Sequence, residues 1–174
     1  ITEDCVSFAI RNKLKSIRSA VPYAQYNIFG SRTGRMTTLP NSFPILTLNK
    51  AFRKIILPNN DKFVEFDFNA FELRVLLYLL DSPQPDIDLH QWNVDNVYRS
   101  LLSREEAKKR IFSWLYNLES SDYLSARSYG REEVLEKYWN GTHITNPFGR
   151  NIESDKFHAV SYLIQSTAID IVLR

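Results

Sequence analysis

Two basic and two aromatic side chains recur at intervals of four residues between positions 104 and 116. They are Arg104, Lys108, Phe112 and Tyr116, and residues four apart lie on one face of an α-helix. We refer to them as the 104–116 row. Cations can hold the outer oxygens of a triphosphate, and an aromatic ring can pack against a base or a sugar. The row therefore suits a nucleotide, although a solvated Arg/Lys turn followed by two core aromatics would give the same pattern.

Two carboxylates precede the row and sit close together in the sequence. Asp67 follows an aromatic, β-branched run, and Glu72 lies in the apolar stretch AFELRVLLYLL. Asp67 could hold Mg²⁺, which prefers oxygen ligands, or it could simply cap the helix that follows. Glu72 needs a hydrogen-bond donor, because carboxylates are rarely buried without a partner. Tyr116 is one candidate donor.

The elements that carry these residues can be predicted from local signals. Residues 62–68 are β-branched and aromatic, which predicts a strand with Asp67 near its end. Residues 70–80 predict a mostly buried helix that ends before Pro83. Ser103 and Glu106 form a capping-box pattern, so a helix should run from there to about Tyr116.

The rest of the chain alternates helical and turn-rich patterns. Residues 5–19 predict an amphipathic helix, and residues 23–58 predict turns with brief strands. Residues 131–139 predict a short helix, 145–150 a turn or hairpin, and 155–174 a final helix.

Composition limits the class of protein. The 174 residues suit one ordinary domain or one lobe of a larger protein, and 44% hydrophobic with 24% charged residues is a globular composition. The net charge of +2 is too small to indicate nucleic-acid binding by itself. A single cysteine cannot form an intrachain disulfide, and the sequence has no long apolar run. We therefore expect a cytoplasmic protein that does not contact a membrane.

Six short segments occur in the order seen in family A DNA polymerases, which the sequence resembles over nearly its whole length. DFNAFELR at 67–74 is similar to the family's motif A, DYSQIELR, and the 104–116 row is similar to motif B on the fingers. The other four are Thr33-Gly34-Arg35, Asp88-Leu89-His90, Phe148-Gly149-Arg150 and QSTAID at 165–170.

The resemblance implies an α+β fold, namely part of the right-hand polymerase architecture. An antiparallel palm sheet would contain the 62–68 strand, and helical fingers would pack at one end. Residues 1–22 would form a helix leading from the thumb, and 23–90 would form the part of the palm with motif A. Residues 91–141 would form the fingers, and 142–174 would return to the palm.

The resemblance also implies a role for each matching residue. Asp67 would bind two catalytic Mg²⁺ ions, with the Phe68 carbonyl as a further ligand. Lys108 would act in catalysis and, with Arg104 and His90, would hold the incoming triphosphate. The sugar would meet Phe112 and a steric gate formed by Glu72, which would bond Tyr116.

Three further residues match positions that contact DNA. They are Thr33, Arg35 and Gln165, of which Arg35 and Gln165 would lie at the primer terminus, where the minor groove offers acceptors common to all correct pairs. An ordinary surface arginine at 35 and an interior polar residue at 165 are the alternatives.

The sequence departs from the family pattern in three ways. Ser113, Asn117 and Ser166 stand where the family usually has glycine, and the fingers are shorter, a style that suits a viral or plasmid-borne enzyme. Motif C, whose His-Asp-Glu run should supply the second metal-binding carboxylate, does not occur in the sequence, and Asp170 is not a substitute for it. We therefore expect a fragment that binds nucleotide weakly and polymerises little or not at all alone.

The function implied is template-directed addition of deoxynucleotides to a primer 3′-OH. Its partners would be primer–template DNA, deoxynucleoside triphosphates and, as an open question, accessory replication proteins. It would act in a bacterial nucleoid or a virus-infected cell, with an organelle as an alternative.

Two other functions remain open at this stage. The first is a single-subunit RNA polymerase, against which Glu72 argues because its bulk would exclude a ribose 2′-hydroxyl. The second is a non-catalytic nucleic-acid-binding replication protein, against which the joint presence of Asp67, Arg104 and Lys108 argues.

Overall fold

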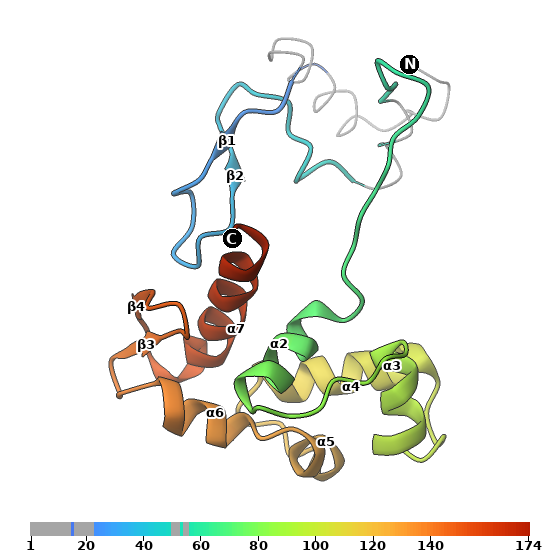
Figure 1. The fold of residues 1–174 in the computed structure, drawn as a ribbon, viewed down its shortest axis with the longest axis vertical. Helices are drawn as coiled ribbons and strands as arrows, with labels where there is room; N and C mark the ends of the chain where they lie inside the picture. Colours follow the sequence, from blue (N-terminus) through green and yellow to red (C-terminus); the bar gives the residue numbers. More distant parts are fainter. Residues whose placement is uncertain (1–14, 16–22, 50–52, 54–55) are drawn as a thin grey trace. The chain divides into compact units, whose positions relative to one another are not determined.

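The chain divides into two units, which are described separately below. The computed structural model describes Lys15, residues 23–49, Arg53 and residues 56–174 (Figure 1). The first unit comprises Ile1–Phe66 and the second Asp67–Arg174. The helix predicted over 5–19 lies outside the described residues except at Lys15, which is helical.

The first unit contains a small hairpin. Strands β1 (Tyr26–Asn27) and β2 (Thr37–Thr38) pair antiparallel. In the loop between them, the Ser31 hydroxyl donates to the Arg35 carbonyl at 2.9 Å, and Gly34 turns the chain with a φ of 83°. The prediction of turns and brief strands for 23–58 is confirmed over the described part of that range.

The prediction of a strand over residues 62–68 is wrong. Residues 62–68 are neither strand nor helix, and every residue from 61 to 69 is exposed. A run of aromatic and β-branched residues favours the extended conformation, but a strand forms only when a neighbouring strand takes up its backbone hydrogen bonds. Within the described residues, this segment has no such neighbour.

The second unit holds most of the regular structure. Its elements are α2 (Phe71–Leu79), α3 (Leu89–Trp92), the π-helix η2 (Asn93–Val97), α4 (Arg104–Tyr116), α5 (Tyr123–Ser128), α6 (Arg131–Tyr138), β3 (His143–Thr145), β4 (Asn151–Glu153) and α7 (Lys156–Val172). Over the described residues the fold is α+β, with six α-helices and two small antiparallel sheets of two strands each. The expected class is confirmed, while the expected palm sheet is not found in this part of the chain. None of the described helices combines the length and the apolar character needed to cross a bilayer.

Most of the predicted helices form where the local signals placed them. The capping box is present, since Glu106 N donates to the Ser103 hydroxyl at 3.4 Å and Glu106 accepts from Ser103 N at 2.9 Å. The helices predicted near 70–80, 131–139 and 155–174 correspond to α2, α6 and α7, and β3 pairs with β4 as the predicted hairpin. Helices α3 and α5 were not predicted, although each begins after an aspartate cap, at Asp88 and Asp122. The predicted division into palm and fingers stays a prediction.

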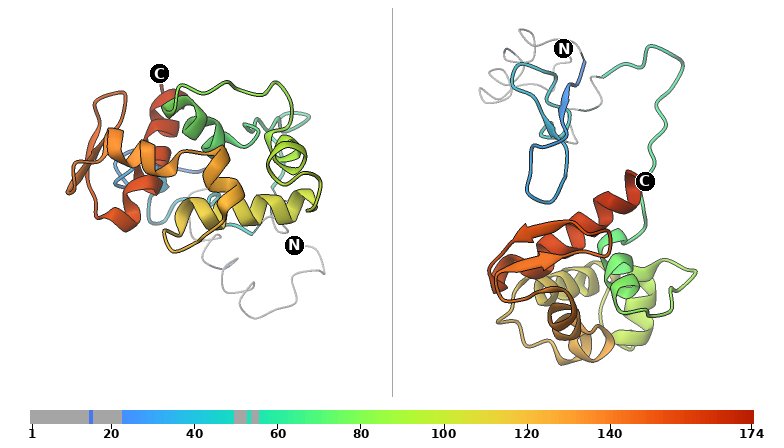
Figure 2. Two further views of the ribbon diagram at one scale, coloured as in Figure 1. Left: turned by 90° about the horizontal axis from the view of Figure 1, so that it is seen from below. Right: turned by 60° about the vertical axis from the view of Figure 1, so that its left-hand side comes forward.

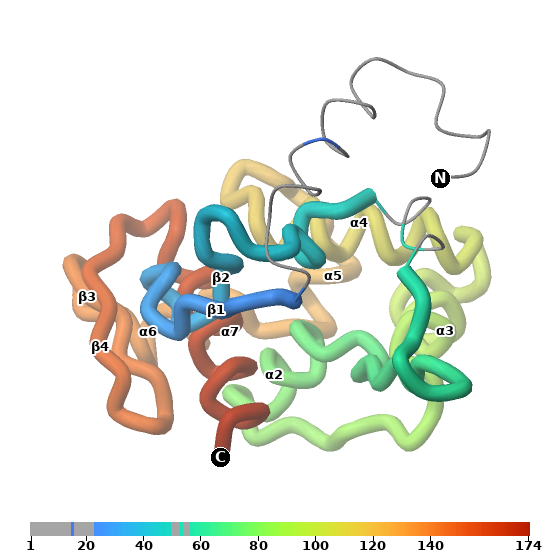
Figure 3. Tube along the Cα trace, turned by 90° about the horizontal axis from the view of Figure 1, so that it is seen from above, coloured from blue at the N-terminus to red at the C-terminus, as the bar shows by residue number. Residues whose placement is uncertain are grey.

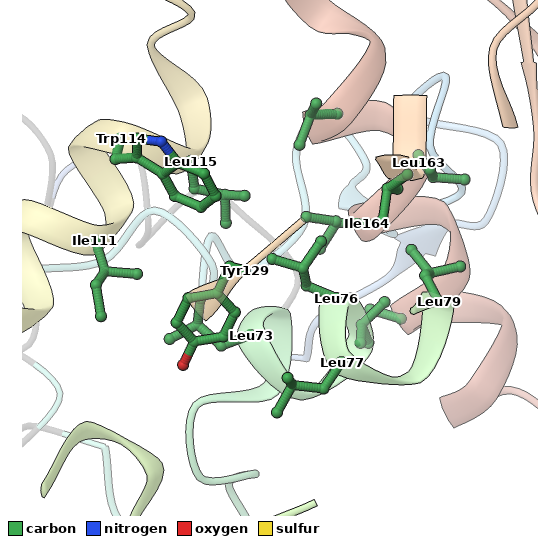
Figure 4. Close-up of a cluster of buried hydrophobic side chains, with 14 of the residues drawn as sticks. Leu73, Leu76, Leu77, Leu79, Ile111, Trp114, Leu115, Tyr129, Leu163 and Ile164 are labelled. Carbon is green, nitrogen blue, oxygen red and sulfur yellow. The ribbon is translucent and has the colours of Figure 1, made fainter. Parts of the chain in front are cut away.

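The core of the second unit lies between α2, α4 and α7. Helix α2 packs against α7, which also contacts α4, α6 and β3. Figure 4 shows leucines of α2 meeting Leu163 and Ile164 of α7, with Ile111 and Leu115 of α4 nearby. All four of these last residues are fully buried. Burial of each such side chain contributes about 1.5–3 kcal/mol, so this cluster fixes the direction of α4 and hence of its outer face.

Figure 2 shows the β3–β4 hairpin beside α7. A buried polar cluster ties the turn of this hairpin to the end of α7. Asp170 accepts from Asn146 Nδ2 at 2.8 Å, from Arg150 Nε at 3.0 Å and from Arg150 Nη2 at 2.6 Å. Asn146 Oδ1 in turn accepts from the backbone N–H groups of Phe148 and Arg150 and so shapes the turn. The Arg150 guanidinium lowers the pKa of Asp170, so the carboxylate is charged at neutral pH. Asp170 thus has a structural role.

Candidate functional site

The structure places the 104–116 row along one face of α4. Phe112 and Tyr116 stack with ring centroids 6.1 Å apart, and both rings are half-buried against the core. Arg104 is half-buried and Lys108 is exposed. The two basic side chains are therefore accessible to solvent, and the two stacked aromatic rings follow them along the same face of the helix.

His90 of α3 lies against the aromatic half of the row. Its ring centroid is 6.0 Å from that of Phe112, and its side chain is only 5% exposed. Its Nδ1 atom is buried and has no hydrogen-bond partner among the described residues. Burial, with the nearby charges of Lys108 and Arg104, lowers the pKa of His90 below 6.5, so the ring is neutral at pH 7. An anion bound beside Lys108 would offset the part of this effect that comes from the two cations.

An ion pair between α3 and α4 was not predicted from the sequence. Asp88 Oδ2 accepts from Arg104 Nη2 at 2.8 Å and from Arg104 Nε at 3.2 Å. Asp88 Oδ1 accepts from the backbone N–H of His90 at 2.8 Å, which caps α3. Burial raises the pKa of Asp88, but the hydrogen bonds from Arg104, Asn69 and the backbone outweigh it and hold that pKa far below its usual range.

Side chains that follow Asp67 hold the segment between α2 and α3. Figure 3 shows the path of this segment from one helix to the other. Arg74 donates to the carbonyls of Pro85 at 3.0 Å and Ile87 at 2.9 Å. Asn69 Oδ1 accepts from the backbone N–H of Leu89 at 2.9 Å. Residues of the DFNAFELR segment therefore fix the start of the helix that carries His90. The sequence offered no signal for this beyond the mixed polarity of the segment.

Asp67 and Phe68 lie just before α2, at the start of the second unit. Both are exposed, and the Phe68 ring stacks on that of Phe71 with centroids 4.5 Å apart. The N-cap of α2 is Ala70, with a left-handed φ of 49° and no side-chain cap. The alternative that Asp67 caps this helix is therefore wrong, and its carboxylate is accessible to a ligand.

Glu72 occupies the first turn of α2 and is half-buried. It is less enclosed than its apolar neighbours in the sequence suggested. Its predicted hydrogen bond to Tyr116, at the end of α4, stays a prediction.

Of the two predicted metal ligands, Asp67 and Phe68, only Asp67 offers a side-chain carboxylate. Among residues 23–49 and 56–174 with Lys15 and Arg53, no three His, Cys, Asp or Glu side chains gather in a group that could hold a metal ion. A two-ion site needs a second carboxylate, so the described residues do not fit such a site by themselves. Asp67 could contribute one ligand to an Mg²⁺ ion that a triphosphate also binds.

The three residues expected at DNA are divided between the two units. Thr33 and Arg35 lie in the hairpin loop of the first unit, where Thr33 is buried and Arg35 is exposed. Gln165 is half-buried on α7 of the second unit. Their contact with DNA stays a prediction.

Comparison with known proteins assigns no family to the chain. No protein-family model matches the sequence, and no curated protein matches it. The function is therefore inferred from the residues of the chain and from the way the fold arranges them.

Proposed function

We propose that the chain is the nucleotide-binding portion of a template-directed DNA polymerase, which adds deoxynucleotides to a primer 3′-OH. The observation that carries this proposal is the face of α4, where Arg104 and Lys108 precede Phe112 and the buried His90 lies against that ring. The partners would be deoxynucleoside triphosphates and primer–template DNA, at a site of DNA replication.

Each part of this face has a use in binding a triphosphate. The phosphate oxygens would meet Arg104 and Lys108, and the sugar or base would pack on Phe112. Burial and the two cations lower the pKa of His90 without ligand, and the negative charge of a phosphate near Lys108 would favour the protonated ring. These residues would act by positioning and electrostatic stabilisation rather than by covalent chemistry.

The carboxylates complete the proposal. Asp67, together with the Phe68 carbonyl, would bind Mg²⁺ that arrives with the triphosphate. Glu72 would stand beside the sugar and exclude a 2′-hydroxyl. Glu72 is the residue that favours a DNA polymerase over an RNA polymerase.

The first experiment measures binding of Mg²⁺–dATP to the 174-residue chain by titration calorimetry. Arg104→Ala and Lys108→Ala should each weaken binding by about tenfold, because a charge-assisted hydrogen bond is worth about 1.5–3 kcal/mol and 1.4 kcal/mol is tenfold. Lys109→Ala is the matched control, since Lys109 is an exposed lysine next to Lys108 and points away from the row. An equal loss in Lys109→Ala, or no binding by the wild type, would contradict the proposal.

The second experiment compares dATP with ATP. We expect the wild type to prefer dATP and the Glu72→Ala variant to lose that preference. Equal affinity of the wild type for both nucleotides would favour the RNA polymerase alternative instead.

A further inference from the structure

We infer that Asp88 is a positioning residue that aligns Arg104 with His90 for the phosphates of the nucleotide. This inference rests on the proposed function, because the aligned groups are those assigned to the triphosphate. Asp88 itself would not touch the nucleotide.

The two oxygens of the Asp88 carboxylate serve two different helices. Oδ2 holds the Arg104 guanidinium through Nη2 and Nε, at 2.8 and 3.2 Å. Oδ1 caps α3 by accepting from the backbone N–H groups of His90 and Gln91, at 2.8 and 3.3 Å. One side chain therefore sets both the rotation of the arginine fork and the start of the helix that carries His90.

The same point is joined to the segment that carries Asp67. Asn69 accepts from the backbone N–H of Leu89, next to Asp88, and its side chain also hydrogen-bonds Asp88. Three pieces of the proposed site, from three places in the sequence, thus meet at Asp88. None of them is adjacent to another along the chain.

A phosphate that binds the arginine would replace Glu105 at Nη1. Asp88 engages Nε and Nη2, and Nη1 donates to Glu105 Oε1 at 3.3 Å at the exposed start of α4. The Arg104 side chain is 40% exposed, so its outer edge faces solvent. A planar guanidinium held on one edge is oriented on the other.

Charges around His90 follow the same arrangement. Lys108 and Arg104 face its ring as cations, and Asp88 and Glu105 face it as anions. Loss of the Asp88 charge would remove one of the two negative charges that offset Lys108 and Arg104 and would lower the pKa of His90 further. The histidine would then accept a proton less readily.

Asp88→Asn tests the inference, because asparagine is as good a helix cap as aspartate but presents no carboxylate to Arg104. We expect its affinity for Mg²⁺–dATP to fall about tenfold in calorimetry. Asp86→Asn is the matched control, since Asp86 is exposed in the same loop, and should bind like the wild type. Circular dichroism should show equal helix content in all three proteins, and Asp88→Ser, which also keeps a cap, should repeat the loss.

A readout at His90 separates positioning from a purely structural effect. The pKa of its ring, followed by NMR, should fall in Asp88→Asn and stay constant in Asp86→Asn. Combining Asp88→Asn with Arg104→Ala should cost less affinity than the sum of the two separate losses, because Asp88 acts in part through that side chain.

The outcomes distinguish the inference from the proposed function. If the wild type binds dATP and Asp88→Asn binds equally well or more tightly, Asp88 does not position Arg104 and only the inference is overturned. Fully additive losses of the two variants would overturn it as well. If the wild type binds no triphosphate, the proposed function and the inference are overturned together.

Discussion

Replacing Asp170 with asparagine should destabilise the second unit by about 2–3 kcal/mol. The side chain is 11% exposed and accepts three hydrogen bonds, two of them from the Arg150 guanidinium. Breaking a buried ion pair costs about 3–5 kcal/mol. The Arg150 side chain is 36% exposed, so water can solvate the guanidinium once its partner is lost. The expected loss of stability is therefore below the range for a fully buried pair.

Urea unfolding followed by circular dichroism at 222 nm measures this change, because helices α2 to α7 all belong to the second unit. The midpoint should fall while the m-value stays constant. Glu136→Gln, an exposed carboxylate on α6, is the control for a change of charge alone. A loss of less than about 1 kcal/mol for Asp170→Asn, or one no larger than the control's, would refute the reasoning.

The same pair predicts a dependence on pH. Folding holds the pKa of Asp170 below its ordinary value of 3.8, first through the Arg150 guanidinium and then through Asn146, against the effect of burial. The stabilisation is therefore complete above 3.8 and is lost as the pH falls through the lower folded-state pKa. The difference between wild type and Asp170→Asn should be constant from pH 5 to pH 7 and should narrow below pH 3.8.

Three further variants test other contacts of the second unit. Tyr129→Phe should cost about 1–2 kcal/mol in urea, because it removes the buried hydrogen bond from the Tyr129 hydroxyl to Asn93. Burial raises the pKa of Tyr129 to about 12, so its stabilisation should be lost between about pH 10 and pH 12 in alkaline titrations. Asp122→Ala should cost about 3 kcal/mol, because it leaves Arg110 and two buried hydroxyls without their acceptor. Gly149→Ala should lower stability by about 1–2 kcal/mol through its φ of 83° alone, since open space surrounds the added methyl group.

Each of these has a clear contrary result. If Tyr129→Phe loses stability between pH 10 and pH 12 as the wild type does, another group causes the alkaline loss of stability. Asp122→Ala with a loss under 1 kcal/mol would mean that water replaces the carboxylate. For Gly149, the asparagine variant should be closer to wild type than alanine, and the reverse order would exclude backbone strain as the cause.

Elements that depend on nearby residues could be predicted from the sequence. The capping box of Ser103 and Glu106 and the apolar spacing after it define α4 with the correct ends. The four-residue spacing then places the row on one face without any tertiary information. The hairpin at 143–153 is local in the same sense.

Elements that depend on distant residues could not be predicted. The 62–68 segment has the composition of a strand, but a strand also needs a neighbour, which composition does not reveal. Helix α3 is too short to show a period. The contact of Asp88 with Arg104 spans 16 positions and follows from the packing of α3 on α4. His90 could be assigned only by resemblance, and its burial and neutrality came from the structure.

The exposed segment at 61–69 also has a practical consequence for handling the protein. Proteases require an extended, accessible backbone, and this segment offers both beside Lys62 and several phenylalanines. A brief trypsin treatment should cut the chain after Lys62, between the hairpin that carries Thr33 and Arg35 and the helical unit that carries the 104–116 row.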